Sequence, residues 1–266
     1  MRIVSLCPSN TEILYALGLG DHVVGLDDHS DWPPEWQHLP RVGPDLAIDM
    51  EKLEALQPDL VVASLSVPGM EKNVAQLEQR GIPHLVLNPA RIDEIAADIE
   101  LVGRAVGWEA RAVQLAEAFR RSVESFRQAT AHVRHRPGLY WEWWPNPLYT
   151  PGRDNWLTDV SELAGARNVF ADFATDNVKA TPQMVRERDP EHICVVWCGI
   201  ELKRIKREMI TGRAEWQEIS AIVNKRVHLL EEGLYCRPSP RILQGLRQLI
   251  PLLHPDLPVP APEAAV

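Results

Sequence analysis

The 266-residue chain lacks long hydrophobic runs and an excess of basic residues. No segment reaches the roughly 18 consecutive apolar residues that suggest a transmembrane helix, so membrane insertion is not expected. Lys and Arg number 28 against 37 Asp and Glu, which gives a net charge of -9. Nucleic acids and anionic membranes are bound by basic surfaces, so neither is an expected partner.

Cysteine is scarce, and the four cysteines form no CxxC motif. Cys194 and Cys198 lie in the apolar segment HICVVWC, where an extended strand would separate them by roughly 13 Å. A disulfide needs Cα atoms within about 7 Å of each other, so a strand prevents this pair from bridging. We therefore expect all four cysteines to be reduced in a reducing compartment.

The N-terminus, MRIVSLCPSNTE, has neither the apolar stretch nor the small-residue cleavage site of a secretory signal peptide. For the chain as it stands we therefore expect a cytoplasmic location. If an export signal has been removed from it, the expected location is instead periplasmic or otherwise extracytoplasmic.

Common enzyme motifs are missing. The chain has no GxxxxGK and no GxSxG, and its first glycines, Gly18 and Gly20, follow a predicted helix, where they indicate a helix end. We expect no enzymatic activity. Cysteine and histidine keep one alternative open, because both bind zinc, copper and iron. A metal-dependent enzyme or metal carrier would use the set that follows predicted strands: Cys7, His29, Cys198 and Cys236.

Short apolar runs alternate with helical patterns along both halves of the chain. In the first half, RIVSL, HVVGL and LVVAS are apolar runs separated by amphipathic segments. The second half repeats this order, and TPQMVRERDPEHICVVW matches DMEKLEALQPDLVVAS down to the Pro and acidic residue before the strand. Alternating strands and helices predict a mostly parallel sheet that is covered on both faces. The sequence therefore predicts an α/β protein with two Rossmann-like lobes.

A long helical segment separates the halves. Residues 108–133 contain no Gly or Pro, and their apolar residues recur at spacings of three, four and seven, which predicts one rigid helix of roughly 39 Å. The tail is rich in Pro and Ala, so we expect disorder there. The predicted parts are an N-terminal lobe (1–107), a connecting helix (108–134), a C-terminal lobe (135–257) and a disordered tail (258–266).

The stretch GLYWEWWPNPLYTPG, residues 138–152, holds three of the nine tryptophans. Aromatic residues suit a buried strand, which accounts for the first part of the stretch. Proline cannot donate a hydrogen bond to a sheet, so the strand is expected to end near Trp144 and the later aromatics to lie in a loop. That loop is either a lid packed on its own lobe or a wall for a large, flat ligand.

Several segments in order resemble the cobalamin-binding proteins of bacterial ABC importers and their siderophore- and haem-binding relatives. The segments are RIVSLCPSNTEILYALGLGDHVVGL, SDWPPE, LPRVG, LEALQPDLVVAS, the long middle helix and RPSPRI. Each alone is a weak signal, but their order and spacing from residue 2 to residue 254 make a strong one. The resemblance implies a non-enzymatic solute-binding protein that serves ABC-type uptake and holds its ligand in a cleft between two lobes joined by a rigid helix.

The implied ligand is a large cyclic or metal-chelate molecule, above all cobalamin or a related corrinoid, and no resident cofactor is required. Haem or a siderophore is the alternative. Position by position, family aromatics fall on His29 and Tyr149, and the family arginine falls on Arg237. Two family tryptophans fall near Asp45 and Asn177, so their rings are missing here.

Ligands of α/β sheets bind at the carboxyl ends of the strands, which independently points to the same loops. Trp144, Trp197 and Tyr235 lie there and are the expected replacements for the missing rings. His29 is placed to contact either the polar edge of the ligand or a metal that the ligand carries. The predicted ligand-binding residues are Pro8, Ser9, His29, Trp144, Tyr149, Trp197, Cys198, Tyr235 and Arg237.

The resemblance also implies one surface glutamate on each lobe that pairs with arginines of a membrane permease. The first falls on Glu71 and the second on Gln183. Because glutamine carries no charge, one of the two ionic contacts is lost unless Glu187, one turn later, supplies it.

Overall fold

The computed structural model describes residues 1–263 and divides into two compact units. Unit 1 contains residues 1–89 and 93–120, and unit 2 contains residues 90–92 and 121–262. Each unit has its own parallel sheet and its own hydrophobic core, which confirms the predicted α/β fold. Within the described residues, no helix combines the length and the apolar character needed to span a bilayer.

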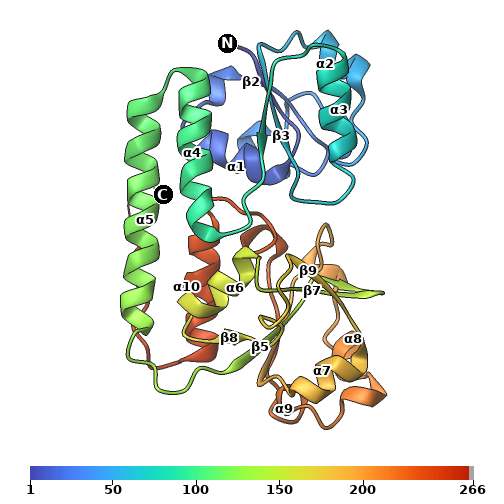
Figure 1. Ribbon diagram of the computed structural model, residues 1–266, viewed down its shortest axis with the longest axis vertical. Coiled ribbons are helices and arrows are strands. Elements are labelled where there is room, and N and C mark those ends of the chain that lie inside the picture. Colours follow the sequence, from blue (N-terminus) through green and yellow to red (C-terminus); the bar gives the residue numbers. More distant parts are fainter. Residues whose placement is uncertain (264–266) are drawn as a thin grey trace. The chain divides into compact units, whose positions relative to one another are not determined.

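Unit 1 is built on a parallel sheet with the strand order β2-β1-β3-β4. Its strands are β1 (Ile3–Ser5), β2 (Val23–Leu26), β3 (Leu60–Ser64) and β4 (His84–Leu87), and its helices are α1 (Pro8–Ala16), α2 (Met50–Ala55), α3 (Glu71–Gln79) and α4 (Ile92–Val106). Helices α2 and α3 lie on one side of the sheet and α4 on the other (Figure 1). Strands β1 and β3 are buried along their whole length because both faces are covered.

Unit 2 contains a parallel sheet of order β11-β10-β5-β8 and a small antiparallel sheet of order β6-β7-β9. Its strands are β5 (Gly138–Glu142), β6 (Trp144–Pro145), β7 (Leu148–Pro151), β8 (Arg167–Asn168), β9 (Asn177–Ala180), β10 (His192–Val195) and β11 (Val227–Leu229). Its helices are α6 (Trp156–Leu163), α7 (Pro182–Arg188), α8 (Glu208–Thr211), α9 (Ser220–Val223) and α10 (Ile242–Leu253). Both units also contain short 3-10 helices. Unit 1 has η1 (Gly20–His22) and η2 (Pro34–Trp36), and unit 2 has η3 (Leu202–Arg204), η4 (Ala214–Trp216) and η5 (Glu232–Leu234).

The loop predicted after residue 144 is instead a β-hairpin. Strands β6 and β7 pair antiparallel, with Trp144 opposite Tyr149, and β7 also pairs with β9. Proline is tolerated because Pro145 and Pro151 are the last residues of their strands. The loop prediction was therefore wrong, because terminal prolines end strands without preventing them.

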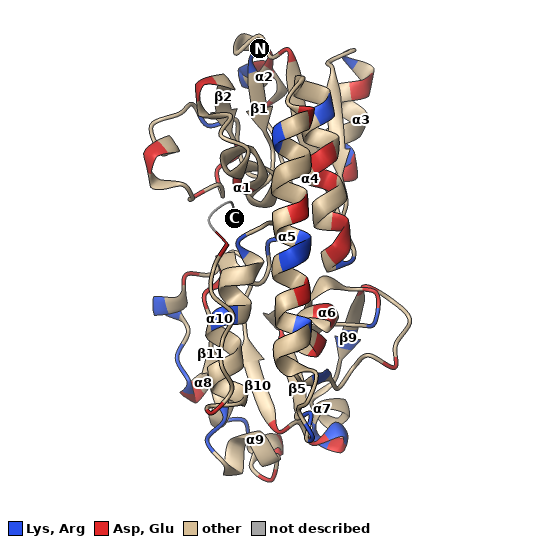
Figure 2. Ribbon diagram, turned by 90° about the vertical axis from the view of Figure 1, so that its left-hand side faces the viewer, with Lys and Arg blue, Asp and Glu red and all other residues tan. Residues whose placement is uncertain are grey.

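Helix α5 (Glu109–Thr130) ends before the predicted boundary. The hydroxyl of Thr130 donates to the carbonyl oxygen of Phe126 (3.2 Å), and the N–H of Val133 donates to the carbonyl oxygen of Thr130 (3.2 Å). A threonine hydroxyl competes for backbone carbonyls, so the helix closes in a turn although the apolar spacing continues. The first part of α5 packs in unit 1 and the rest in unit 2. Both α4 and α5 carry charged side chains along their length (Figure 2).

Residues 258–263 form neither helix nor strand. Nε of Arg247 in α10 lies 3.3 Å from the carbonyl oxygen of Pro260. The last three residues of the predicted disordered tail, 264–266, lie outside the described residues.

Asp98 in α4 is a half-buried acid with one buried, unsatisfied oxygen. Its Oδ2 atom has no hydrogen-bond partner. Burial, followed by the charge of the neighbouring Glu94, raises the pKa of Asp98 to about 7. An unfolded aspartate titrates near 4, so the stability that Asp98 contributes is fully present below about pH 4 and is lost as the pH rises through about 7.

Replacing Asp98 by Asn is therefore expected to raise the free energy of unfolding at about pH 8 by about 1 kcal/mol, because Asn mimics the protonated acid and water partly screens this side chain. The gain should vanish at about pH 4. Urea unfolding at both pH values measures it, with the exposed Glu117→Gln as the control. An equal gain at both pH values would contradict the assigned titration.

Candidate functional site

In each unit the parallel strands end at one edge of the sheet, and the predicted ligand-binding residues follow those ends. The unit 1 edge is defined as residues 7–9, 27–31, 45–46 and 65–70. The unit 2 edge consists of residues 143–149, 197–200 and 231–237, together with the strand β9 beside the hairpin. Each edge is described by itself.

A histidine and an aspartate form the polar part of the unit 1 edge. His29 Nε2 lies 3.7 Å from Asp45 Oδ1, and 52% of the His29 side chain is exposed. Burial raises the pKa of Asp45, while His29 acts in the opposite direction. The structure therefore leaves His29 accessible to a ligand and gives it a carboxylate partner.

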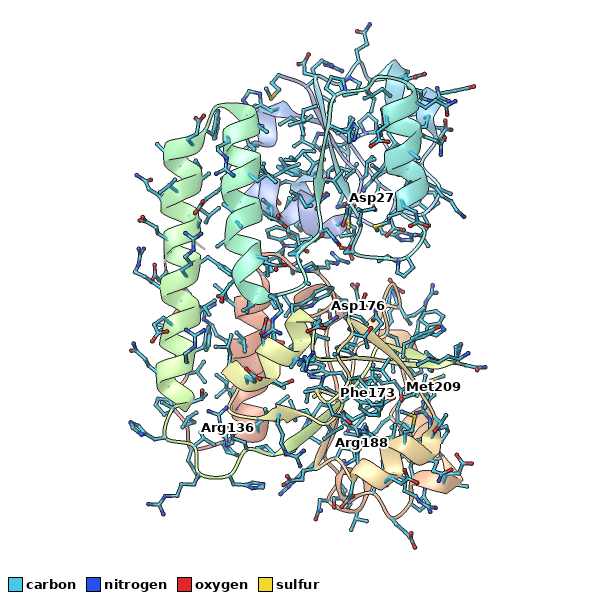
Figure 3. The ribbon with its side chains drawn as sticks, viewed as in Figure 1. Asp27, Arg136, Phe173, Asp176, Arg188 and Met209 are labelled. Atoms are coloured by element: carbon cyan, nitrogen blue, oxygen red, sulfur yellow. The ribbon has the colours of Figure 1, made fainter. Side chains whose placement is uncertain are left out.

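The loop that carries His29 is fixed by Asp27, which is labelled in Figure 3. Asp27 accepts hydrogen bonds from the Ser30 hydroxyl and from the N–H of His29 (2.8 Å). Its side chain is buried, and that burial raises the pKa of Asp27 to about 6. Because its carboxylate accepts both hydrogen bonds and is buried, Asp27 stabilises the loop and has no exposed surface for a ligand.

Exposed apolar side chains complete the unit 1 edge. Leu46, Leu65 and Val67 are exposed by 46%, 38% and 40%. Leu46 packs over Gly69, where its Cδ2 lies 3.4 Å from the position that a Cβ atom would take. Single Leu and Val residues are common on protein surfaces, so nothing in the sequence distinguished them.

Pro8 and Ser9, both predicted ligand contacts, are buried at the start of α1. Ser9 Oγ lies 3.3 Å from Cys7 Sγ. Burial raises the pKa of Cys7 to about 11, so its thiol stays protonated and is a poor metal ligand near neutral pH. These residues therefore lie under the edge and present little exposed surface to a ligand.

An exposed row of side chains crosses the small sheet of unit 2. Trp144, Tyr149 and Lys179 lie opposite one another on β6, β7 and β9, and directly opposite residues share one face of a sheet. Trp144 is 40% exposed and Tyr149 37%. The neighbours of Tyr149 along β7, Leu148 and Thr150, are buried on the other face. Lys179 was missed because its place beside Tyr149 depends on the pairing of β7 with β9.

Trp197 is held by a buried ionic network. Its Nε1 donates to Glu142 Oε1 (3.0 Å), and Glu142 has no exposed surface. Arg213 binds both oxygens of Glu142 at 2.5 and 2.8 Å, and its guanidinium lies 4.3 Å from the ring centroid of Trp216. Trp197 keeps 8% of its surface exposed, so most of its ring is covered by protein.

Tyr235 is a predicted ligand contact, and the structure places its ring away from solvent. The ring is fully buried, packs 5.6 Å from the Trp141 ring and donates its hydroxyl to the carbonyl oxygen of Gly245 (2.8 Å). The 3-10 turn η5 ends just before Tyr235, and the ring is directed toward α10. Arg237 stays at the edge, where Nη2 pairs with Glu232 at 3.0 Å and 8% of the residue is exposed.

All four cysteines are free, and Cys198 alone is exposed. It lies near Cys236 and contributes to raising the pKa of that thiol. Throughout residues 1–263, no group of three or more His, Cys, Asp or Glu side chains is placed to hold a metal ion.

Two α/β units with aromatic, apolar and polar side chains at the carboxyl ends of their strands, and a helix that belongs to both units, define a class of solute-binding protein. Residues 3–233 match the model of the periplasmic binding protein family, and the chain belongs to that family.

Similar proteins bear this out. YvrC, an uncharacterized ABC transporter substrate-binding lipoprotein of Bacillus subtilis strain 168, is 33% identical over 260 residues, which cover 96% of this chain and 80% of that protein. A vitamin B12-binding protein of Yersinia pestis strain Pestoides F is 30% identical over 263 residues, which cover 99% and 89%. The crystal structure of the periplasmic vitamin B12 binding protein BtuF of Vibrio cholerae has a TM-score of 0.78 and 29% identity, and the match covers 95% of this chain and 96% of that one.

The Glu142–Arg213 pair predicts a large effect on stability. Replacing Arg213 by Met leaves a buried carboxylate without its cation, so we expect unfolding free energy to fall by about 3–5 kcal/mol. The double variant Glu142→Gln with Arg213→Met should recover a substantial part of that loss. Urea unfolding measures both.

The control is Arg204→Met, because Arg204 pairs with Glu201 at the surface (3.2 Å) and should cost less than about 1 kcal/mol. Equal losses for Arg213→Met and Arg204→Met would show that the buried pair contributes no more than a surface pair.

Proposed function

We propose that this chain is a non-enzymatic solute-binding protein whose ligand is cobalamin or a related corrinoid. The observation that carries the proposal is the exposed pair Trp144 and Tyr149, two aromatic rings on one face of the hairpin. A corrin ring is large and flat, and such a molecule stacks well on aromatic side chains. The 30% identity with a vitamin B12-binding protein across 99% of this chain supports the same ligand.

Other residues at the unit 2 edge have distinct roles in the proposal. Lys179 continues the aromatic row, so a negatively charged group of a stacked ligand would meet a cation there. Trp197 contributes the small exposed part of a side chain that Glu142 holds in place. Arg237 supplies donors to a carboxylate, amide or phosphate, with Glu232 fixing its guanidinium.

The unit 1 edge supplies a different chemistry. His29 is the exposed polar group, and its imidazole suits either a hydrogen bond to the ligand or contact with a metal that the ligand carries. Leu46, Leu65 and Val67 supply apolar surface for the hydrocarbon part of a macrocycle. In the proposal, these residues take the place of the missing tryptophan near Asp45.

The experiment that tests the ligand is an absorption titration. The purified chain is mixed in turn with cobalamin, cobinamide and haem, and each spectrum is compared with that of the free ligand. We expect saturable changes with cobalamin and cobinamide. A response to haem alone would replace the corrinoid by haem, and no response to any of the three would refute the proposal.

Replacing Tyr149 or Trp144 by Ala should weaken corrinoid binding by about 1–3 kcal/mol, roughly five- to a hundredfold, because each change removes a stacking face. Lys179→Ala should cost less, since exposed charges are screened by water and salt. The control is Val223→Ala. Val223 is 63% exposed on α9, which comes just before the start of β11 and so lies away from the carboxyl ends of the strands. Unchanged affinity in both aromatic variants would show that the hairpin does not bind the ligand and is a lid packed on its own unit.

We further propose that Glu71 is a contact for an ABC permease. It is exposed at the start of α3, and its Oε2 accepts the N–H of Gly69 (2.7 Å); backbone hydrogen bonds lower the pKa of Glu71, which favours the ionised form. In unit 2, Gln183 Nε2 donates to Glu187 Oε1 (2.7 Å) on one face of α7. Glu187 is therefore the proposed second carboxylate in place of the expected glutamate at 183.

A further inference from the structure

Two thiols come together at the ends of neighbouring strands in unit 2. Strands β10 and β11 are adjacent and parallel, and Cys198 and Cys236 follow their carboxyl ends. Cys236 Sγ donates to the carbonyl oxygen of Val196 (3.1 Å), two residues before Cys198. The two side chains are near enough for Cys198 to raise the pKa of Cys236. The pairing of the two strands and the contact with Val196 thus bring the two cysteines into one neighbourhood.

The surroundings of the cysteines differ. Cys198 is exposed and Cys236 half-buried, while Cys7 and Cys194 are buried. Burial raises the pKa of Cys236, and the nearby Cys198 raises it further. Burial also raises the pKa of Cys194. Reactivity of a thiol requires access and the thiolate form, so a reagent in solution meets Cys198 first.

We propose that Cys198 and Cys236 are a reversible redox site that closes to an intramolecular disulfide by exchange with a small disulfide of the glutathione class. A disulfide requires an S–S distance of about 2.05 Å and Cα atoms about 4.4–6.8 Å apart. Neighbouring thiols on loops that follow adjacent strands can reach that geometry by a displacement of those loops. No other pair among the four cysteines is brought together in this way within the described residues.

The exchange proceeds in two balanced steps. The Cys198 thiolate attacks one sulfur of oxidised glutathione, which forms a mixed disulfide on Cys198 and releases one glutathione thiolate. Cys236 then loses its proton to solvent and attacks the Cys198 sulfur, which forms the protein disulfide and releases the second glutathione. Two protein thiols are oxidised and one small disulfide is reduced. Because Cys236 is the more buried thiol with the raised pKa, the second step should quicken as the pH rises.

The site does not depend on the identity of the ligand, because it is read out by counting thiols. It adds one consequence that rests on the proposed function. The disulfide would join the segments that carry Trp197 and Arg237, so it would change the presentation of both to a corrinoid.

The test treats the folded, full-length chain with oxidised glutathione, quenches with acid, and counts thiols after denaturation. We expect the count to fall from four to two, peptide mapping to link Cys198 with Cys236, and dithiothreitol to restore four. Cys236→Ser should stop at the mixed disulfide and gain one glutathionyl group on Cys198, seen by intact mass. The Cys198→Ser variant should keep all three of its thiols after the same treatment.

The matched control is Cys7→Ser, because Cys7 Sγ already contacts the hydroxyl of Ser9 (3.3 Å) and serine fits the same surroundings. It should still lose two thiols on oxidation. Circular dichroism confirms that each variant is folded before treatment. A count that stays at four in the wild type, a disulfide that includes Cys7 or Cys194, or unchanged oxidation of Cys198→Ser would each overturn the proposal.

Discussion

The organisation of each unit depends on the direction of its parallel strands. Parallel strands begin at one edge of a sheet and end at the other, so segments far apart in sequence meet after their strands end. In unit 1 this brings His29, Asp45 and Leu65 to one edge. In unit 2 it brings Trp197, Cys198 and Cys236 to one edge. The candidate site is therefore a product of topology, and no compact motif along the chain contains it.

Charge at the unit 2 edge is divided between a structural and an exposed role. The fully buried Glu142 pairs with the half-buried Arg213 and fixes Trp197 through one hydrogen bond. This pair tolerates little rearrangement, because loss of Arg213 would leave an unsolvated charge on Glu142. Lys179, by contrast, is exposed beside the aromatic rings. The unit 2 edge thus has a charged pair that fixes its structure and an exposed cation that a ligand can reach.

The fold could be predicted from the sequence because alternating apolar runs and helical patterns are local signals. The hairpin was missed because three prolines outweighed the alternation of buried and exposed residues from Leu148 to Thr150. Tyr235 was placed at the ligand by its position in the chain, whereas the direction of its ring depends on packing against α10. The neighbours of Lys179 and Cys198 depend on strand register, which composition and spacing do not determine.

The exposure of Trp144 has a spectroscopic consequence. The chain has nine tryptophans, and within the described residues Trp144 is the one classed as exposed. Water reaches its indole, while Trp141, Trp197 and Trp216 are enclosed by protein. A soluble collisional quencher such as acrylamide should therefore remove the red edge of the intrinsic fluorescence first. Trp32 and Trp108 are half-buried and contribute less to that emission, so it reports chiefly on whatever covers the hairpin.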